Sequence, residues 1–419
     1  MSKVKVVLEH YDQTLKRARK LRLEVGGKTV YTPSRTLSLK EDASCESRLI
    51  RYNSLRGINE IYRRLTKEKL DEIDDNPAKL VDFGRSLKNV LNRPECKDDV
   101  SLLVFSYENK NKNGGISQNT VPKKDEIKYL CNVVSHPLSD VIVPPRISGL
   151  SGEKYLEFLK AFFEQLPSYT TNAPMLGLIP LVARNDFDRI ANFYVEKGIY
   201  SYIADFQNQN PLDAYIFAGM IHSLSDFITK EYKEDSYVHA LNIPSTRTRQ
   251  KVDVTPAKDI MTFAMGFDSY GTSHLPQKLP EKVVKQIMER RAVSGFGPRS
   301  PTATPAVFLG EEDAEVFRLF NRNDYGYYRS TLADLKTKFP DEEHISVKFD
   351  QLFDEKVSEY KLQKLRRVFN VERQALEAAD LRLKIVEDSI MKHIESKKYA
   401  RDGVKILNKM SHRITDYMS

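Results

Sequence analysis

The stretch PMLGLIPLVARNDFDRIANFYVEKGIYSYIADF, residues 174–206, decides the fold, because two short apolar runs flank one amphipathic segment. The run at 174–180 has the length and composition of a buried parallel strand, and the run at 199–206 reads as the next strand. Between them, apolar residues recur on one helical face: Phe187, Ile190, Ala191, Tyr194 and Val195. The spacing predicts a strand–helix–strand unit with parallel strands.

The same alternation continues on both sides of this unit. Downstream we expect a helix over roughly 212–230, a strand in SYVHALNIP (236–244), and a helix in 256–274 that runs into a polar segment around Asp268. The expected parallel strands lie near 101–107, 140–144, 175–179, 199–205 and 236–241. Repeated strand–helix units predict the α/β class, as a TIM-like (β/α)8 barrel with an N-terminal β-hairpin and a helical C-terminal addition.

Segments outside this core are expected to be mixed. LRLEVGGKTVYTP, with its Gly-Gly pair at 26–27, is typical of a β-hairpin. Helices are expected near 54–71 and 77–92, and the chain is expected to be helical from about 311 onward.

The length of 419 residues exceeds that of a plain barrel, which is about 250 residues. We therefore expect two regions. Residues 1–300 form the barrel with its N-terminal hairpin, and residues 301–419 form a helical region that completes the barrel and contacts nucleic acid.

Composition narrows the class of protein. The chain has 66 Lys and Arg against 58 Asp and Glu, a net charge of +8, which favours a polyanionic partner such as nucleic acid. Its three cysteines, Cys45, Cys96 and Cys131, are far apart and form no CxxC pair, so neither a cysteine-rich zinc site nor a disulfide framework is expected. The N-terminus has no apolar run of signal-peptide length, and no window is apolar enough to span a membrane. We expect a cytoplasmic protein with no membrane association.

Polar residues follow the predicted strands. In parallel α/β folds, functional groups lie where strands end and the next loop begins. Asp205, His239, Asn242 and Asp268 are candidate site residues for this reason. The alternative for Asp268 is a turn residue, because Asp-Ser-Tyr-Gly is turn-like. His239 and His274 are each either structural or serve to orient a neighbouring group.

Several segments, in the same order along the chain, resemble the tRNA-guanine transglycosylase family, whose members exchange guanine for a 7-deazaguanine base. RARKLRLEVGGKTVYTP (17–33) resembles the family's opening hairpin, and GIYSYIADFQNQNP (198–211) its strand and base-recognition loop. VHALN (238–242) and MGFDSY (265–270) resemble the archaeosine-type run that ends in Phe-Asp-Ser. Residues 369–410 resemble the archaeosine-type C-terminal helix.

The chain also departs from the family's pattern. Family members bind zinc through three cysteines and a histidine, but residues 321–339 contain no cysteine and Phe369 stands near the histidine's position. Ser106, Tyr107 and Glu108 stand where the family has Asp-Ser-Gly. We therefore expect neither a metal nor another cofactor.

The family's nucleophilic aspartate can be matched in two ways. A match that allows a three-residue gap makes Asp268 the nucleophile. A match without a gap gives Asp268 the place of an earlier aspartate and puts Gly271 at the nucleophile's position. The sequence leaves both alignments open.

The resemblance implies a nucleic-acid guanine transglycosylase with Asp268 and Glu108 as catalytic carboxylates. Base exchange needs a carboxylate at the sugar C1′ and a second acid/base for the leaving guanine. The residues expected to bind the substrate are Asp205, Gln207, His239 and Asn242. Phosphate contacts are expected from Arg247, Arg249 and Lys251, between a strand end and a helix start.

Other interpretations stay open. The nucleic acid is DNA or tRNA, because related enzymes in phage and bacterial systems place 7-deazaguanines in DNA. A non-catalytic nucleic-acid-binding or partner subunit on the same fold is the first alternative, and a barrel enzyme for a small phosphorylated metabolite is the second. A homo- or hetero-oligomer is compatible with each of them.

Overall fold

The structure is a computed structural model of the whole chain, and it describes residues 3–40, 45–108, 119–135, 139–168, 173–245, 252–275, 318–329, 335–354 and 356–417. All statements below concern these ranges.

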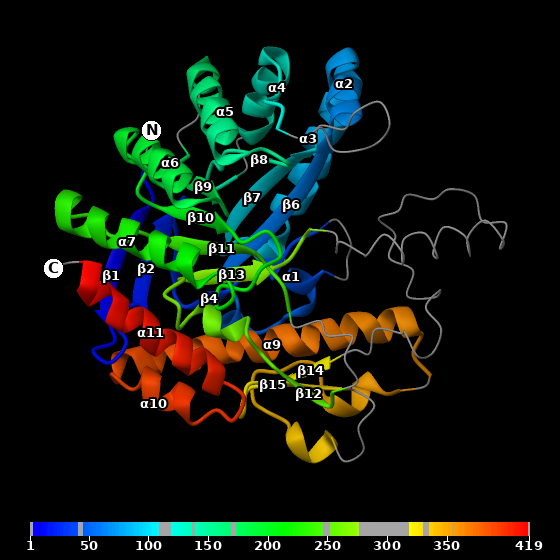
Figure 1. Cartoon of the computed structure of the whole chain (residues 1–419). Helices are drawn as coiled ribbons and strands as arrows, with labels where there is room; N and C mark the ends of the chain where they lie inside the picture. Colours follow the sequence, from blue (N-terminus) through cyan, green and yellow to red (C-terminus); the bar gives the residue numbers. More distant parts are fainter. Residues whose placement is uncertain are drawn as a thin grey trace.

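Two parallel sheets form the centre of the molecule (Figure 1). One has the strand order β4 (Ser34–Arg35), β13 (Ser269–Thr272), β11 (Val238–Ile243), β10 (Tyr202–Asp205) and β9 (Gly177–Pro180). The other has the order β5 (Leu37–Ser38), β6 (Ile58–Thr66), β7 (Val100–Glu108) and β8 (Arg146–Ile147). Every neighbouring pair in both sheets is parallel, so the chain belongs to the mixed α/β class.

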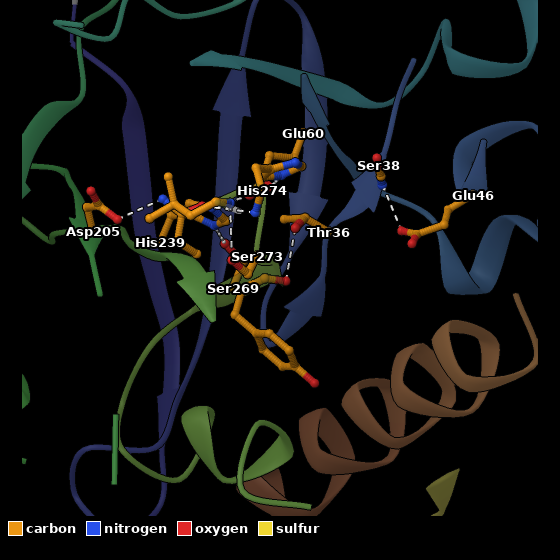
Figure 2. A network of polar contacts seen from close by, with 12 residues as sticks. Thr36, Ser38, Glu46, Glu60, Asp205, His239, Ser269, Ser273 and His274 are labelled. Carbon is orange, nitrogen blue, oxygen red and sulfur yellow. Dashed lines mark hydrogen bonds and ion pairs between the residues drawn. The ribbon is translucent and has the colours of Figure 1, made fainter. Parts of the chain in front are cut away.

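The two sheets meet at two places. Residues 34–38 supply β4 to one sheet and β5 to the other, and Thr36 between them donates its backbone N–H and its Oγ1 to the Tyr270 carbonyl at 3.0 and 2.9 Å (Figure 2). The short helix α1 (Glu46–Leu49) supports this segment, because Ser38 N donates to Glu46 at 2.9 Å. At the other end of the strand order, Ile142 forms a parallel bridge with Met175, just before β9.

Six helices accompany these strands and fan around them in Figure 1. Their bounds are α2 Lys67–Asp75, α3 Pro77–Leu91, α4 Lys124–Val134, α5 Gly152–Gln165, α6 Arg184–Glu196 and α7 Tyr215–Tyr232. The face predicted for α6 is confirmed, because its five apolar residues are all buried. Burial of such a stripe against the sheet is what holds a helix of this length in place.

The parallel strands expected near 101–107, 175–179, 199–205 and 236–241 are confirmed as β7, β9, β10 and β11. The segment near 140–144 makes only the Ile142 bridge, and β8 follows it at Arg146–Ile147. The hairpin is also confirmed: β2 (Arg19–Val25) and β3 (Lys28–Tyr31) are antiparallel around Gly26 and Gly27. Both glycines have positive φ, 58° and 78°, as a tight two-residue turn requires. β1 (Lys5–Tyr11) pairs with β2.

Two helix predictions are wrong. Residues 54–71 contain the strand β6, which runs directly into α2 through the helix-capping Thr66. Residues 256–274 contain the end of β12 (Val254–Pro256), a 3-10 turn at Ile260–Thr262 and the strand β13. Both strands carry buried polar residues whose partners are distant in sequence. The local pattern of apolar residues therefore does not reveal either strand.

The prediction that the chain is helical from about 311 onward is wrong in part, because this region also contains strands. β14 (Arg318–Asn321) and β15 (Gly326–Arg329) form an antiparallel hairpin, and β12 pairs with β15. The remaining elements are α9 Glu359–Val386, α10 Ile390–Glu395, α11 Arg401–Tyr417 and 3-10 turns at Asn53–Leu55, Pro94–Cys96, Leu166–Ser168, Leu335–Lys338 and Phe349–Leu352. A second apolar core forms between α9 and these segments, around Phe339 and Phe369.

β1 and β2 also form an antiparallel hairpin, and the turn between them is bound to the C-terminal helices. Asp12 accepts from the backbone N–H of Ile390 at 3.0 Å, and Gln13 donates its backbone N–H to Asp388 at 2.8 Å. Arg17 donates to the Met410 carbonyl at 2.6 Å. None of the helices in the described ranges is long and apolar enough to cross a membrane.

Candidate active site

Strand β6 carries three polar side chains at alternate positions: Glu60, Tyr62 and Arg64. Side chains two residues apart on a strand point to the same face of the sheet. Glu60 contacts His239 of β11, and Tyr62 contacts His274, which follows β13. β6 therefore presents this row of polar groups to the other sheet, as Figure 2 shows for Glu60.

Glu60 accepts hydrogen bonds from two histidines, and its side chain is only 1% exposed. Its Oε2 lies 2.7 Å from His239 Nε2, and its Oε1 binds His274 Nε2. His239 is fully buried, whereas the side chain of His274 is 7% exposed. Three segments separated by 179 and 214 residues thus converge on one carboxylate (Figure 2).

The space for this carboxylate exists because residue 271 is a glycine. A Cβ at Gly271 would lie 2.3 Å from Glu60 Oε2 and 2.6 Å from its Cδ. Real Cβ atoms do not make contacts this short, so any larger residue at 271 displaces Glu60 or distorts β13.

The surroundings keep Glu60 ionised. Burial by itself raises the pKa of Glu60, but the charge of His274 and the hydrogen bonds from both histidines outweigh it and hold the pKa below its ordinary value. A buried carboxylate of this kind needs positive charge beside it.

His239 is held on both sides of its ring. Nε2 faces Glu60, and Nδ1 lies 2.8 Å from the Oγ of Ser269, the first residue of β13. Ser269 Oγ also lies 2.5 Å from the hydroxyl of Tyr237, which is 2% exposed. Burial raises the pKa of Tyr237, so this phenol keeps its proton.

His274 is held through its backbone and its ring. Its N–H donates to Asn242 Oδ1 at 3.1 Å, and its carbonyl accepts from Arg64. Its ring stacks on Tyr62, with centroids 4.6 Å apart and planes 5° from parallel. These contacts fix the ring of His274, but its side chain is still more exposed to solvent than that of His239.

A second ion pair lies at the carboxyl end of β10. Asp205 accepts from Arg146 Nε at 2.6 Å, from Asn242 Nδ2 at 2.7 Å and from the Gln207 backbone N–H at 3.1 Å. Asp205 and Asn242 are fully buried, and Asn242 also binds the backbone of His274. Four sequence candidates, Asp205, Gln207, His239 and Asn242, thus belong to one connected cluster. The side chain of Gln207 itself is exposed, and its φ of 51° lies in the left-handed region.

Glu108 is the last residue of β7 and is half-buried. It pairs in register with Thr66, at the same edge as the ends of the neighbouring strands. Burial lowers the pKa of Arg146, but the charge of Asp205 raises it above its ordinary value, and the charge of Glu108 adds to this effect. Glu108 is therefore close to the Arg146–Asp205 pair and stays a candidate.

Asp268 does not lie with these groups, and the prediction that it shares the mouth with Asp205 is wrong. It precedes β13, at the amino end of the sheet, and its Oδ2 accepts from the Val238 backbone N–H at 2.7 Å. Arg19 of β2 binds both of its oxygens, at 2.8 and 2.9 Å, and also donates to Ser225 of α7. Asp268 therefore joins the hairpin to the sheet and to α7. This structural role explains why Asp268 is buried and requires no catalytic function.

The predicted phosphate-binding residues Arg247, Arg249 and Lys251 lie outside the described residues. Within the described ranges, no group of three or more His, Cys, Asp or Glu side chains has an arrangement that holds a metal ion.

The sequence pattern did not point to four residues of this cluster: Glu60, Tyr62, Arg64 and Arg146. The one local signal for Glu60 is a lone carboxylate in the β-rich run INEIYRRLT, flanked by Ile58 and Ile61. A charged residue inside such a run marks either a solvated face or a compensated interior group. Only the fold distinguishes the two.

The sequence matches no protein-family model and no curated protein. Among solved structures, the chain is similar to a GH26 beta-mannanase from Bacteroides ovatus, with 11% identity and a TM-score of 0.32 over 55% of this chain and 74% of that chain. It is also similar to a glucosidase from Croceicoccus marinus, with 8% identity and a TM-score of 0.33 over 57% of this chain and 63% of that chain. Likeness at this level carries no argument about activity, so the site rests on its own geometry.

Proposed function

We propose that this protein is a guanine base-exchange transglycosylase acting on nucleic acid, with Glu60 as the carboxylate at the sugar. The observation that carries the proposal is the convergence of Glu60, His239 and His274 beside the Arg146–Asp205 pair. This arrangement places one ionised carboxylate next to an imidazole that can hold or release a proton. Base exchange requires these two groups.

The framework proposed for this site is a (β/α)8 barrel. Residues 34–38 belong to both sheets, and the Ile142–Met175 bridge joins their other ends. Counted this way, eight parallel segments follow one another around a ring. In barrels of this kind, functional groups come from the carboxyl ends of several different strands, which agrees with the origins of Asp205, Asn242 and His274.

These residues account for every bond and proton in the two steps of base exchange. Glu60 forms a bond to C1′ while the bond from C1′ to the guanine nitrogen breaks, and an imidazolium gives its proton to the leaving base. The incoming 7-deazaguanine then attacks C1′, returns a proton to the imidazole and releases the carboxylate. The oxocarbenium-like sugar in between is stabilised by the negative charge.

The resemblance to the transglycosylase family supports this assignment through its ungapped match. That match puts Gly271 at the nucleophile's position, and the carboxylate of Glu60 fills the space beside Gly271. In this proposal the nucleophilic carboxylate comes from β6 and not from β13. Asp268 then takes the place of the family's earlier aspartate, in a structural ion pair.

The remaining assignments complete the proposal. Asp205, with Asn242 and Gln207, is proposed to bind the base, and Glu108 to assist at the same edge. Arg247, Arg249 and Lys251 are proposed to bind phosphates of DNA or tRNA, because Lys and Arg supply most non-specific affinity for nucleic acid.

The test is base exchange by the Glu60→Gln variant, with labelled guanine or 7-deazaguanine and either DNA or tRNA. An amide keeps the shape but neither attacks nor stabilises the cation well, so the exchange rate should fall on the order of 10³-fold or more, about 4 kcal/mol. Glu157→Gln, at an exposed position on α5, is the control and should keep the wild-type rate. Exchange by Glu60→Gln within tenfold of wild type would rule out this role.

One observation favours a second candidate, a non-catalytic nucleic-acid-binding subunit. Both oxygens of Glu60 and of Asp205 are already hydrogen-bonded within the protein, and both side chains are buried. If wild type binds DNA or tRNA with steep salt dependence but exchanges no base in either, this second function replaces the first.

A further inference from the structure

A continuous chain of side-chain hydrogen bonds runs through the site. It passes from the Tyr237 hydroxyl to Ser269 Oγ, from Ser269 to His239 Nδ1, from His239 Nε2 to Glu60, and from Glu60 to His274 Nε2. Hydrogen positions in such a chain follow from the donors and acceptors available at each link.

The Tyr237 end sets the direction of the chain. Tyr237 is buried and keeps its phenolic hydrogen, which needs an acceptor. Within the described residues, its hydroxyl has one hydrogen-bond partner, Ser269 Oγ at 2.5 Å. Tyr237 therefore donates to Ser269, and the hydrogen of Ser269 is left to point at His239 Nδ1.

His239 then has only one tautomer that fits. Its Nδ1 accepts from Ser269, so its hydrogen is on Nε2 and is donated to Glu60. The opposite tautomer would direct a lone pair at an ionised carboxylate. A doubly protonated His239 would make Ser269 Oγ accept from both Tyr237 and His239, which leaves the buried Ser269 hydrogen without a partner in the described residues.

The charge of Glu60 must consequently be balanced elsewhere. Arg146 is already paired with Asp205, and Arg19 with Asp268. His274 is bound to the other oxygen of Glu60 and is the histidine with the larger solvent contact, 7% against none. The positive charge beside Glu60 therefore belongs to His274.

We propose that His239 is a positioning residue locked as the neutral Nε2–H tautomer by Tyr237 and Ser269, and that His274 is the imidazole that carries the exchangeable proton. The part played by His274 in base exchange rests on the proposed function. The tautomer of His239 does not, since it follows from hydrogen bonds within the protein.

The groups that face His274 come from four elements. They are Glu60, Tyr62 and Arg64 of β6, Asn242 at the end of β11, and, behind Tyr62, the Arg146–Asp205 pair of β8 and β10. One anion contacts the ring directly, and the cation of Arg64 contacts its carbonyl. The ring of His274 thus has the carboxylate of Glu60 as its direct charged neighbour.

The test is nitrogen NMR of the full chain with ¹⁵N-labelled histidine, in which the ring nitrogens report protonation and tautomer. His239→Gln and His274→Gln identify the two sets of signals among the eight histidines. We expect His239 to show a neutral Nε2–H ring from pH 6 to 8, and His274 to show an imidazolium at the acid end. A neutral His274 throughout, or a charged or Nδ1–H His239, would overturn the proposal.

The Ser269→Ala variant gives a second test of the His239 tautomer by the same NMR measurement. It removes both the acceptor of Tyr237 and the donor to His239, so the His239 Nδ1 signal should shift as its hydrogen bond is lost, while Nε2 keeps its hydrogen toward Glu60. The control is Ser236→Ala, because Ser236 is equally buried and its Oγ has no hydrogen-bond partner in the described structure. His239 signals that are unchanged in Ser269→Ala would also overturn the lock. Neither result depends on base exchange, so a protein that exchanges no base can still pass or fail this test.

Discussion

Glu60 and Glu377 are both buried glutamates that lie 2.7 Å from the Nε2 of a histidine, yet their other partners differ. Glu377 of α9 also binds Arg322 at 3.1 Å and the Tyr325 hydroxyl at 2.7 Å, with Lys397 at 4.0 Å. Among the residues that the structure describes, Glu60 binds two histidines and neither an arginine nor a lysine. One carboxylate is balanced by permanent charges and the other by groups that titrate.

The difference indicates which cluster is built for chemistry. A carboxylate with an arginine keeps its charge balance at every physiological pH, which suits a structural contact between α9, α10 and the β14–β15 turn. A carboxylate with histidines alone changes its balance whenever a proton moves. By this criterion Asp268, paired with Arg19, belongs with Glu377 and not with Glu60.

Asp205 combines features of both groups. It has a permanent partner in Arg146, but within the described part of the chain its second oxygen accepts only from the Asn242 amide and the Gln207 backbone. Its position at the end of β10 places it with the Glu60 cluster. Asp205 therefore fits a role in orienting or binding a ligand better than a role in proton transfer.

The largest loss of stability is expected for Asp268→Asn. The substitution leaves the Arg19 guanidinium, whose side chain is 15% exposed, without its two-point partner, which typically costs about 3–5 kcal/mol. Urea unfolding of the wild type and the variant measures this cost. Base exchange, assayed well below the unfolding temperature, should stay near the wild-type rate. A stable Asp268→Asn protein without activity would return Asp268 to the catalytic residues.

The next effect concerns Glu377 and pH. Burial raises the pKa of Glu377, but the hydrogen bond from His393 and the charges of Lys397 and Arg322 lower it from 4.5 to about 2. A lowered pKa stabilises the folded state above the unfolded value, by about 3 kcal/mol here, and this stability is lost as the pH falls from about 5 to about 2.

Glu377→Gln should remove that part of the acid dependence and weaken the protein at neutral pH, without changing base exchange. The measurement is the free energy of unfolding against pH for the variant and the wild type. Equal slopes between pH 5 and pH 2 for the two proteins would contradict the structural role of Glu377.

Gly271→Ala tests the Glu60 cluster directly. Its Cβ would lie 2.3 Å from Glu60 Oε2, and overpacking of this kind costs about 1–3 kcal/mol. We expect this loss together with a lower exchange rate, since Glu60 must move. Gly219→Ala in α7 is the control, because its nearest neighbour would be Met410 Cε at 4.0 Å, and it should stabilise the helix by up to about 1 kcal/mol. An unchanged exchange rate in Gly271→Ala would mean that the position of Glu60 does not matter.

The smallest effect is expected for Asp213→Asn. Asp213 pairs with Lys258 at 2.6 Å, but the two side chains are 53% and 44% exposed. Solvent screens such a pair, so the unfolding free energy should fall by less than about 1 kcal/mol. A loss as large as that for Asp268→Asn would show that burial does not explain the difference between these ion pairs.

The fold was predictable where burial leaves a regular pattern. The apolar runs of β7, β9, β10 and β11 and the one-sided stripe of α6 are local signals of buried elements, and the structure has each of them. β6 was not predictable in this way. Its inner face is polar and its last residue caps the next helix, so strand and helix merge into one charged segment.

The candidate site was predictable only in part, for the same reason. Asp205, His239 and Asn242 follow or lie in recognisable strands, and they do belong to the cluster. Glu60 could not be chosen, because its partners are 179 and 214 residues away and no local pattern shows that its charge is balanced. The pattern of residues 256–274 predicts a helix where β13 lies, so it does not reveal that Asp268 stands at the amino end of a strand.

The contacts between the hairpin and the C-terminal helices set an order of events during synthesis. Asp12, Gln13 and Arg17 reach residues 388–410 of the same chain, so these contacts wait until almost all of the protein has left the ribosome. Because chains fold from the N-terminus as they emerge, the first hairpin made is among the last elements to be secured. A nascent chain stalled before residue 388 should therefore expose this hairpin to proteases and chaperones, whereas the released chain should protect it.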